Sequence, residues 1–174
     1  PKGRFTEQHD IFFGIGSTLK ELVPDMKTFW PEAKGKIHID AWQKITHVDG
    51  FSIEVVTKES EIEGTEKLFF LNLGGYKEGD FEEYHYKVLV VAKTKSEAIK
   101  KAKKTTFFQH VGFKGGGETH IDDKYGVDVD DIHKIDDILD VQYKLNYRLK
   151  ITKTDTLSTD EKHIGYIALT KLKK

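Results

Sequence analysis

The amino-acid sequence predicts an α+β fold, with two tandem copies of a strand-strand-helix-strand-strand unit, mostly antiparallel sheet and a C-terminal β-hairpin. Three observations predict this fold. Residue types recur in the same order through two long segments. In each segment, a strand-like stretch runs directly into a helix-capping signal. The last part of the chain alternates apolar and polar residues on both sides of a polar loop.

The repeat includes polar residues as well as apolar ones. At an offset of 76 residues, Glu7 and His9 fall on Glu83 and His85. After an insertion, the offset becomes 82, which places His38 on His120. We therefore expect a first repeat over residues 1–66, a second repeat over 67–140 and the hairpin extension over 141–174.

The first copy is expected to open with a strand over Gln8–Ile15. A capping box formed by Thr18 and Glu21 then predicts a helix start, and Pro24 lies inside that helix, where proline can introduce a kink. Further extended stretches are expected over residues 36–46 and 51–57.

The second copy repeats this order. Its opening strand ends at a glycine pair, its next strand is apolar enough to be buried on both faces, and its helix has a side of small residues that allows close packing. The expected elements are strands over 67–75 and 84–92, a helix capped by Thr94 and Glu97, an extended stretch over 119–129, and hairpin arms over 143–153 and 164–172.

The first copy has no counterpart of the 67–75 strand before Pro1. We expect a strand of that kind to belong there, either outside this sequence or supplied by another chain. Without it, the neighbouring strand keeps an edge of unpaired N–H and C=O groups, which favours pairing with a partner.

Composition excludes several classes of protein. The 174 residues include no cysteine, which rules out disulfides, thiolate metal ligands and cysteine nucleophiles. No apolar run approaches the length of a membrane span, so a membrane partner is not expected. The lack of cysteine and of a targeting segment favours the cytoplasm, although a leader before Pro1 would overturn this expectation.

Paired acids and histidines are the candidate functional residues. Residues i and i+2 of a strand share a face, so each Glu-x-His and each His-x-Asp pair points in one direction. If the two stretches of a copy lie side by side, each copy gathers two imidazoles and two carboxylates. The two sets are Glu7, His9, His38 and Asp40 in the first copy, and Glu83, His85, His120 and Asp122 in the second.

These sets are open to three interpretations. They could hold a divalent metal, because imidazole and carboxylate suit Zn²⁺ and other first-row ions. They could use a histidine as a general base that a carboxylate orients. They could also be a structural hydrogen-bond network that was duplicated with the fold. No recognised ligand spacing such as H-E-x-x-H is present to select the metal.

Two charged stretches have plainer interpretations. The second helix carries Lys100, Lys101 and other lysines, which could contact phosphate, but the net charge of −1 favours a solvated face, and nucleic acid is not the expected partner. The aspartates between 123 and 140 lack the glycine and final glutamate of a calcium loop, so a solvated acidic loop is expected.

Seven short motifs together point to one known family: Glu7–Asp10, Phe13–Gly16, His38–Trp42, Val48–Gly50, Leu71–Tyr76, Glu83-x-His85 and Glu97-Ala98. In these motifs, the chain resembles a bacterial family that is known as domain of unknown function 1543. The resemblance extends over about residues 1–140, and it implies the duplicated organisation but no catalytic residue, because the family has no assigned activity.

The expected function is that of a non-catalytic module that self-associates or binds another protein. It rests on the repeat, the open edge and the lack of a recognised catalytic motif. The alternative is a small, hydrolase-like metal-binding enzyme that uses the duplicated His/Asp/Glu sets. A third hypothesis is phosphate or nucleic-acid binding through the lysine-rich helix.

Overall fold

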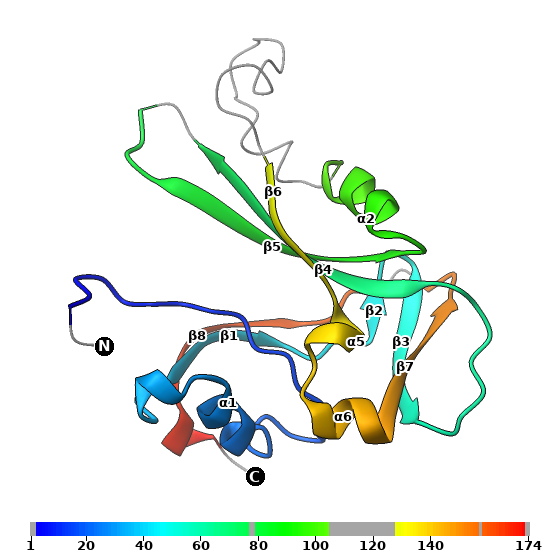
Figure 1. Ribbon diagram of the computed structural model, residues 1–174, viewed down its shortest axis with the longest axis horizontal. Coiled ribbons are helices and arrows are strands. Elements are labelled where there is room, and N and C mark those ends of the chain that lie inside the picture. Colours follow the sequence, from blue (N-terminus) through cyan, green and yellow to red (C-terminus); the bar gives the residue numbers. More distant parts are fainter. Residues whose placement is uncertain (1–2, 77–78, 105–127, 157, 173–174) are drawn as a thin grey trace.

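The computed structural model describes residues 3–76, 79–104, 128–156 and 158–172 (Figure 1). It has the predicted α+β character, with short helices and antiparallel strand pairs. No described helix has the length and apolar character that crossing a membrane requires. The elements are α1 (Val23–Phe29), η1 (Pro31–Ala33), β1 (His38–Gln43), β2 (His47–Val48), β3 (Phe51–Thr57), β4 (Lys67–Tyr76), β5 (Glu83–Ala92), α2 (Lys95–Ala102), β6 (Asp128–Lys134), α5 (Ile135–Ile138), α6 (Val141–Asn146), β7 (Tyr147–Lys153), β8 (Lys162–Ala168) and η2 (Leu169–Lys171).

The largest antiparallel sheet has the strand order β5-β4-β6. Its central strand, β4, pairs with β5 from Lys67 to Tyr76 and with β6 from Phe69 to Gly74. Helix α2 covers one face of this sheet (Figure 1). Ala98 and Ala102 of α2 are fully buried against the sheet. This confirms the prediction that small residues bring the helix close to the strands.

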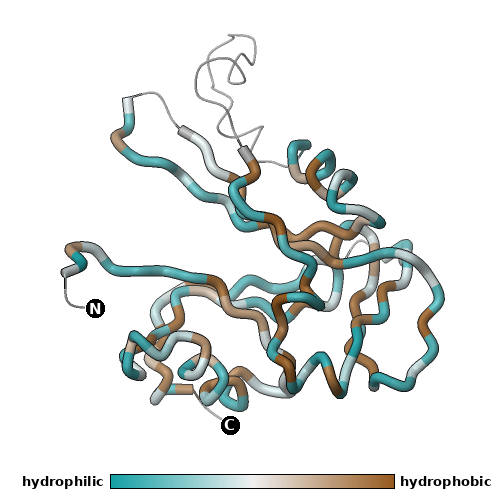
Figure 2. Tube along the Cα trace, in the orientation of Figure 1, coloured by the Kyte–Doolittle hydropathy of each residue, from teal (hydrophilic) through white to brown (hydrophobic). Residues whose placement is uncertain are grey.

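The two faces of β4 belong to two cores, because successive side chains of a strand point in opposite directions. Phe69, Leu71 and Leu73 face α2, whereas Leu68 and Phe70 face the rest of the molecule. The second core joins β4 to the sheet β2-β3-β7 and to helices α5 and α6. Figure 2 shows hydrophobic residues gathered where β4 crosses the middle of the molecule.

The predicted C-terminal hairpin is wrong. Strand β7 pairs with β3, and β8 pairs with β1, so the two strands contact different partners. The start of the expected first arm is helix α6, whose N-cap Asp140 accepts a hydrogen bond from the N–H of Gln142 at 2.9 Å. Alternation indicates that a strand has one buried face, but it does not identify the neighbouring strand.

Asp160 anchors the segment between β7 and β8 to the first part of the chain. Its carboxylate accepts hydrogen bonds from the backbone N–H groups of Thr46 and His47, at 2.6 and 2.9 Å, and from the Thr46 hydroxyl. The side chain is 8% exposed. Burial opposes ionisation, but these hydrogen bonds outweigh it and lower the pKa of Asp160 below its ordinary value.

The first copy departs from its predicted elements in two places. Residues 8–15 are extended but pair with no described strand, so the predicted strand is not formed. Ile11 and Phe13 nevertheless pack against the second core, which accounts for the alternation. Helix α1 begins only at Val23, so Pro24 lies in its first turn, where the missing N–H breaks no helical hydrogen bond, and the expected kink is absent.

The capping-box hydrogen bonds form at both positions, but only Thr94 caps a helix. The helix start predicted at Thr18 is wrong, because residues 17–22 form a bend and turns and α1 begins at Val23 with Leu22 as its N-cap. Thr94 Oγ1 accepts from the N–H of Glu97 at 3.2 Å, and the Glu97 carboxylate accepts from the N–H that precedes Thr94 at 2.8 Å. In the first copy, Thr18 Oγ1 accepts from the N–H of Glu21 at 3.4 Å, and Glu21 accepts from the preceding N–H at 2.9 Å. The two segments therefore share a set of local hydrogen bonds, although a helix follows directly only at Thr94.

Candidate functional site

The four predicted residues of the first copy lie together. Glu7 and His9 come from the extended segment before α1, and His38 and Asp40 come from β1. His9 Nε2 lies 3.8 Å from a Glu7 oxygen and 3.6 Å from an Asp40 oxygen. His38 Nε2 lies 3.2 Å from an oxygen of each carboxylate. Each imidazole thus faces both carboxylates, and the four groups alternate in sign around a ring when the histidines are protonated.

This first set is open to solvent. Its side chains are between 23% and 61% exposed, and His38 is the most covered of them. The ring of His38 is partly covered by Tyr166 of β8, with the ring centroids 4.6 Å apart. A network that existed only to satisfy buried polar groups would not need this exposure.

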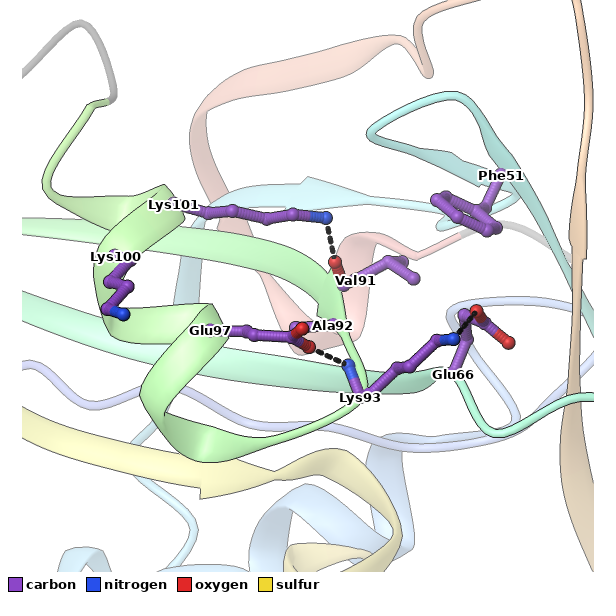
Figure 3. Close-up of a pocket in the computed structure, with 8 residues that line it drawn as sticks. All are labelled: Phe51, Glu66, Val91, Ala92, Lys93, Glu97, Lys100 and Lys101. Carbon is purple, nitrogen blue, oxygen red and sulfur yellow. Dashed lines mark hydrogen bonds and ion pairs between the residues drawn. The ribbon is translucent and has the colours of Figure 1, made fainter.

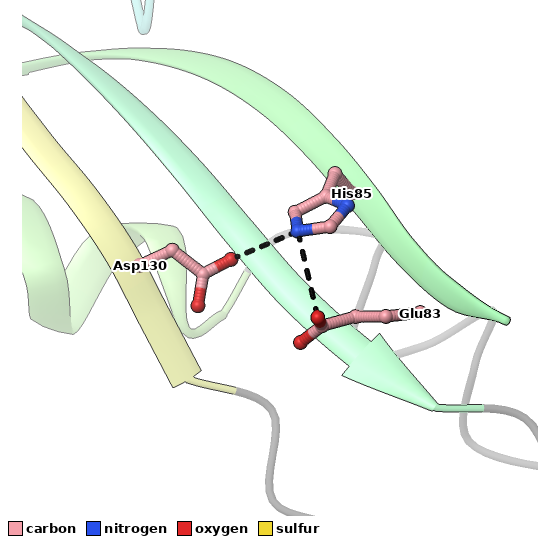
Figure 4. Close-up of side chains that lie close together, drawn as sticks. All are labelled: Glu83, His85 and Asp130. Atoms are coloured by element: carbon pink, nitrogen blue, oxygen red, sulfur yellow. Dashed lines mark ion pairs between the residues drawn. The ribbon is translucent and has the colours of Figure 1, made fainter. Parts of the chain in front are cut away.

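The second copy brings together Glu83, His85 and a residue that the sequence analysis did not select, Asp130. His85 Nε2 lies 3.4 Å from an oxygen of Asp130 on β6 and 3.9 Å from an oxygen of Glu83, its neighbour on β5 (Figure 4). The three ligand atoms all lie within 4.8 Å of one another. The predicted partners His120 and Asp122 lie outside the described residues.

Asp130 reaches His85 across the central strand because β4 carries a glycine there. Gly74 lies opposite His85, and a Cβ atom on Gly74 would lie only 2.4 Å from an Asp130 carboxylate oxygen. Asp130 is also the extra residue at an irregularity in the β4–β6 pairing, where Asn72 faces Asp131 and Leu73 faces Val129. The glycine and the bulge together allow this contact.

Two distances are alike in the two sets. The histidine-to-glutamate distances are 3.8 and 3.9 Å, and the histidine-to-aspartate distances are 3.6 and 3.4 Å. Asp40 also lies at an irregularity in strand pairing, between Ile39 and Ala41 of β1, but there the extra residue belongs to β8, whereas Asp130 is itself the extra residue of β6. Asp130 therefore matches Asp40 in its distance to the histidine. The one signal for it in the sequence was the Asp-x-Asp pattern at its strand start, inside a stretch interpreted as a loop.

Helix α2, which carries Lys100 and Lys101, forms one wall of a cavity of about 270 Å³ (Figure 3). Lys101 Nζ donates to the carbonyl oxygen of Val91 at 2.5 Å, and Lys93 Nζ lies 3.9 Å from Glu66. Glu97 also lines this cavity. Two carboxylates and a carbonyl thus accompany the lysines, which reduces the positive charge that a phosphate would meet. The geometry does not favour the phosphate hypothesis.

Residues 4–55 match the family model described as Domain of Unknown Function (DUF1543), so the resemblance predicted from the sequence is confirmed over that stretch. The matched stretch includes all four residues of the first set. No curated protein and no solved structure matches the chain.

Proposed function

We propose that this protein is a non-catalytic interaction module that takes an extended strand from a partner chain between residues 8–15 and β1. The partner is a second copy of this chain or another protein that carries a suitable segment. The proposal rests above all on one observation: in the first copy, the backbone on both sides of that position lacks the pairing that the second copy has.

The unpaired backbone is extensive. Between Phe5 and Gly16, no backbone group hydrogen-bonds to the backbone of another described residue. Strand β1 pairs with β8 alone in the described part of the chain. Side chains satisfy some of these groups: the N–H of Ile11 donates to Asp10 Oδ1 at 2.7 Å, and Gln8 Nε2 donates to the carbonyl oxygen of Thr6 at 3.2 Å. Extended backbone without a backbone partner is the template for strand addition.

The second copy supplies the model for the occupant. There, β4 lies between β5 and β6 and runs antiparallel to both. His85 and Asp130 meet across β4 at 3.4 Å, and His9 and Asp40 meet at 3.6 Å. Because these two distances are nearly equal, we infer that the segments carrying His9 and Asp40 are also one strand apart.

The turn before the first set supports the same duplicated arrangement. Gly79, which follows β4 in the second copy, has a φ of +86°, and Gly3 has the same φ. Only glycine adopts this conformation without strain. Together with the matching hydrogen bonds at Thr18 and Thr94, this supports two tandem units of common origin.

The occupant should have the chemistry of β4. One face should be apolar, so that it adds to the core near Phe13, and a glycine should lie opposite His9, as Gly74 lies opposite His85. A larger residue at that point would displace the Asp40 carboxylate from His9. The location that we propose is the cytoplasm, which rests on the cysteine-free composition.

A peptide tests the proposal. A synthetic copy of residues 67–76, extended with lysines for solubility, should bind and slow amide hydrogen exchange at residues 8–15 and in β1. The matched control peptide carries leucine at the position of Gly74 and should bind at least about tenfold more weakly, which corresponds to about 1.4 kcal/mol. Equal binding of both peptides, or no protection, would contradict the proposal.

A second arm tests the same position with the strand supplied in the same chain. The β4 sequence is joined ahead of Pro1 through a copy of residues 77–79. Because the joined strand has a high effective concentration, it should protect the amides of residues 8–15 and of β1 and should exclude the free peptide. A joined protein in which residues 8–15 and β1 stay unprotected would contradict the proposal.

A second candidate function is a small metal-binding enzyme. It is favoured by the short histidine-to-carboxylate distances among four partly exposed side chains, Glu7, His9, His38 and Asp40. Metal analysis of protein purified without chelator tests it. His38→Ala should abolish any bound metal while the circular dichroism spectrum stays unchanged, whereas a variant that only unfolds would support a structural network.

A further inference from the structure

The geometry points to a binding site for a first-row divalent cation, of the Mn²⁺ or Zn²⁺ type, formed by Glu83, His85 and Asp130. The donor set is one imidazole nitrogen and two carboxylate oxygens, which together suit such ions. The inference does not rest on the proposed interaction function, because it concerns the second copy, in which β4 is already present.

The distances fit a cation better than hydrogen bonds. His85 Nε2 lies 3.4 and 3.9 Å from the two oxygens. A charge-assisted N–H···O hydrogen bond is about 2.7–2.9 Å long. Ligands about 2.1 Å from a tetrahedral Zn²⁺ lie about 3.4 Å from one another. The His85–Asp130 separation equals this value, the His85–Glu83 separation is 0.5 Å longer, and the three donor atoms all lie within 4.8 Å of one another.

The donors also converge on one point. Both carboxylates approach the same nitrogen of His85, Nε2, and a single N–H cannot donate well to both at these distances. Figure 4 shows Glu83 and Asp130 reaching toward this nitrogen from two different strands. The side chains are 32–39% exposed, so water could fill the remaining coordination positions.

A second observation comes from β4 itself. Asn72 lies two residues before Gly74, on the same face of the strand, and its Oδ1 atom is buried without a hydrogen-bond partner among the described residues. A buried amide oxygen without a partner is costly. In the β4–β6 pairing Asn72 faces Asp131, so this oxygen belongs to the polar face next to the three donors and is not one of them. Gly74 meanwhile keeps the space beside the Asp130 carboxylate open, since any Cβ would lie within 2.4 Å of it.

Paramagnetic NMR tests the site directly. Mn²⁺ added to the ¹⁵N-labelled protein should broaden the amide signals of residues 83–87 and of Asp130, and Zn²⁺ should compete this broadening away. Asp130→Asn and His85→Gln should each weaken the binding at least about tenfold. Removing a residue that only hydrogen-bonds to a metal ligand already costs about 10- to 100-fold in metal affinity, so removing a ligand should cost no less. The first set stays intact in every variant, so any binding there is constant.

Two further variants make the test specific. Asp137→Asn removes an exposed carboxylate of α5, beyond the far end of β6, and should leave the broadening unchanged. Gly74→Ala should weaken it, because the new Cβ pushes away only the end of a flexible side chain and the sheet can be retained. Absence of broadening near His85 at millimolar Mn²⁺, or equal broadening in the Asp130→Asn variant, would overturn the inference.

Discussion

Replacing Asp160 by alanine should destabilise the protein by about 2–4 kcal/mol. The carboxylate accepts from the N–H groups of Thr46 and His47 at 2.6 and 2.9 Å, in a position where only 8% of the side chain is exposed. Alanine would leave both donors without that acceptor, and each buried donor that loses its partner costs about 1–3 kcal/mol. For a chain of this size, a loss of about 3 kcal/mol lowers Tm by roughly 6–12 °C.

Urea unfolding followed by circular dichroism measures this loss. Asp160→Asn keeps one acceptor oxygen and should lie between the alanine variant and the wild type. Asp155→Ala removes an exposed carboxylate from the same connecting segment and should change the free energy of unfolding by less than about 0.5 kcal/mol. An Asp160→Ala variant as stable as the Asp155→Ala control would refute the reasoning.

The pH dependence gives an independent check on Asp160. Its folded pKa is below the unfolded value of about 3.9, so the folded state binds the proton less readily than the unfolded chain. The stabilisation is therefore fully present above the unfolded pKa and is lost as the pH falls through the folded pKa. The difference between the wild type and Asp160→Ala should be largest near neutral pH and should shrink on acidification. A difference that is equal at pH 7 and pH 3 would assign the effect to packing instead.

Three further predictions concern the cores and caps. Burial and a hydrogen bond to Asp25 raise the pKa of Tyr143 to about 12, so its contribution to stability should be complete below pH 10 and should decline above it; Tyr143→Phe should remove that decline in alkaline unfolding curves. Leu71→Ala, at a fully buried position, should cost about 2–5 kcal/mol in urea unfolding. Thr94→Ala should cost about 1 kcal/mol, and Thr94→Ser, which keeps the hydroxyl, should cost less; equal losses would show that the cap hydrogen bond is not the cause.

The parts of the fold that the sequence predicted depend on short-range signals. A hydroxyl and a carboxylate three residues apart identified the cap of α2, and an apolar run identified β5. The same signal at Thr18 formed its hydrogen bonds but no helix start. Strand partners depend on contacts between distant segments, and alternation does not carry that information. The pairing of β7 with β3 was therefore missed, since a nearby strand across a polar loop gave the same pattern.

The candidate site was predictable to a similar degree. The first set was found in full, because Glu7 with His9 and His38 with Asp40 are each spaced as strand neighbours. Asp130 was missed because its position depends on a bulge, and a one-residue irregularity changes the face on which a side chain lies. Aligning the two repeats at a constant spacing of 76 or 82 residues cannot show that a bulge has turned a side chain to the other face.

The contact of His85 with Asp130 across Gly74 also links the strand-addition proposal to the cation-site proposal. In a regular strand, an aspartate reaches an imidazole two strands away only if the side chains between them are small. In the second copy, Gly74 meets that requirement, and His85 contacts Asp130 above it. In the first copy, His9 and Asp40 keep almost the same separation with no described strand paired between their segments. A strand added there would lie beneath the four polar side chains of the first set, as β4 lies beneath Glu83, His85 and Asp130 in the second. Strand addition and cation binding would then meet at one place in the first repeat, and only the second repeat allows cation binding to be measured separately.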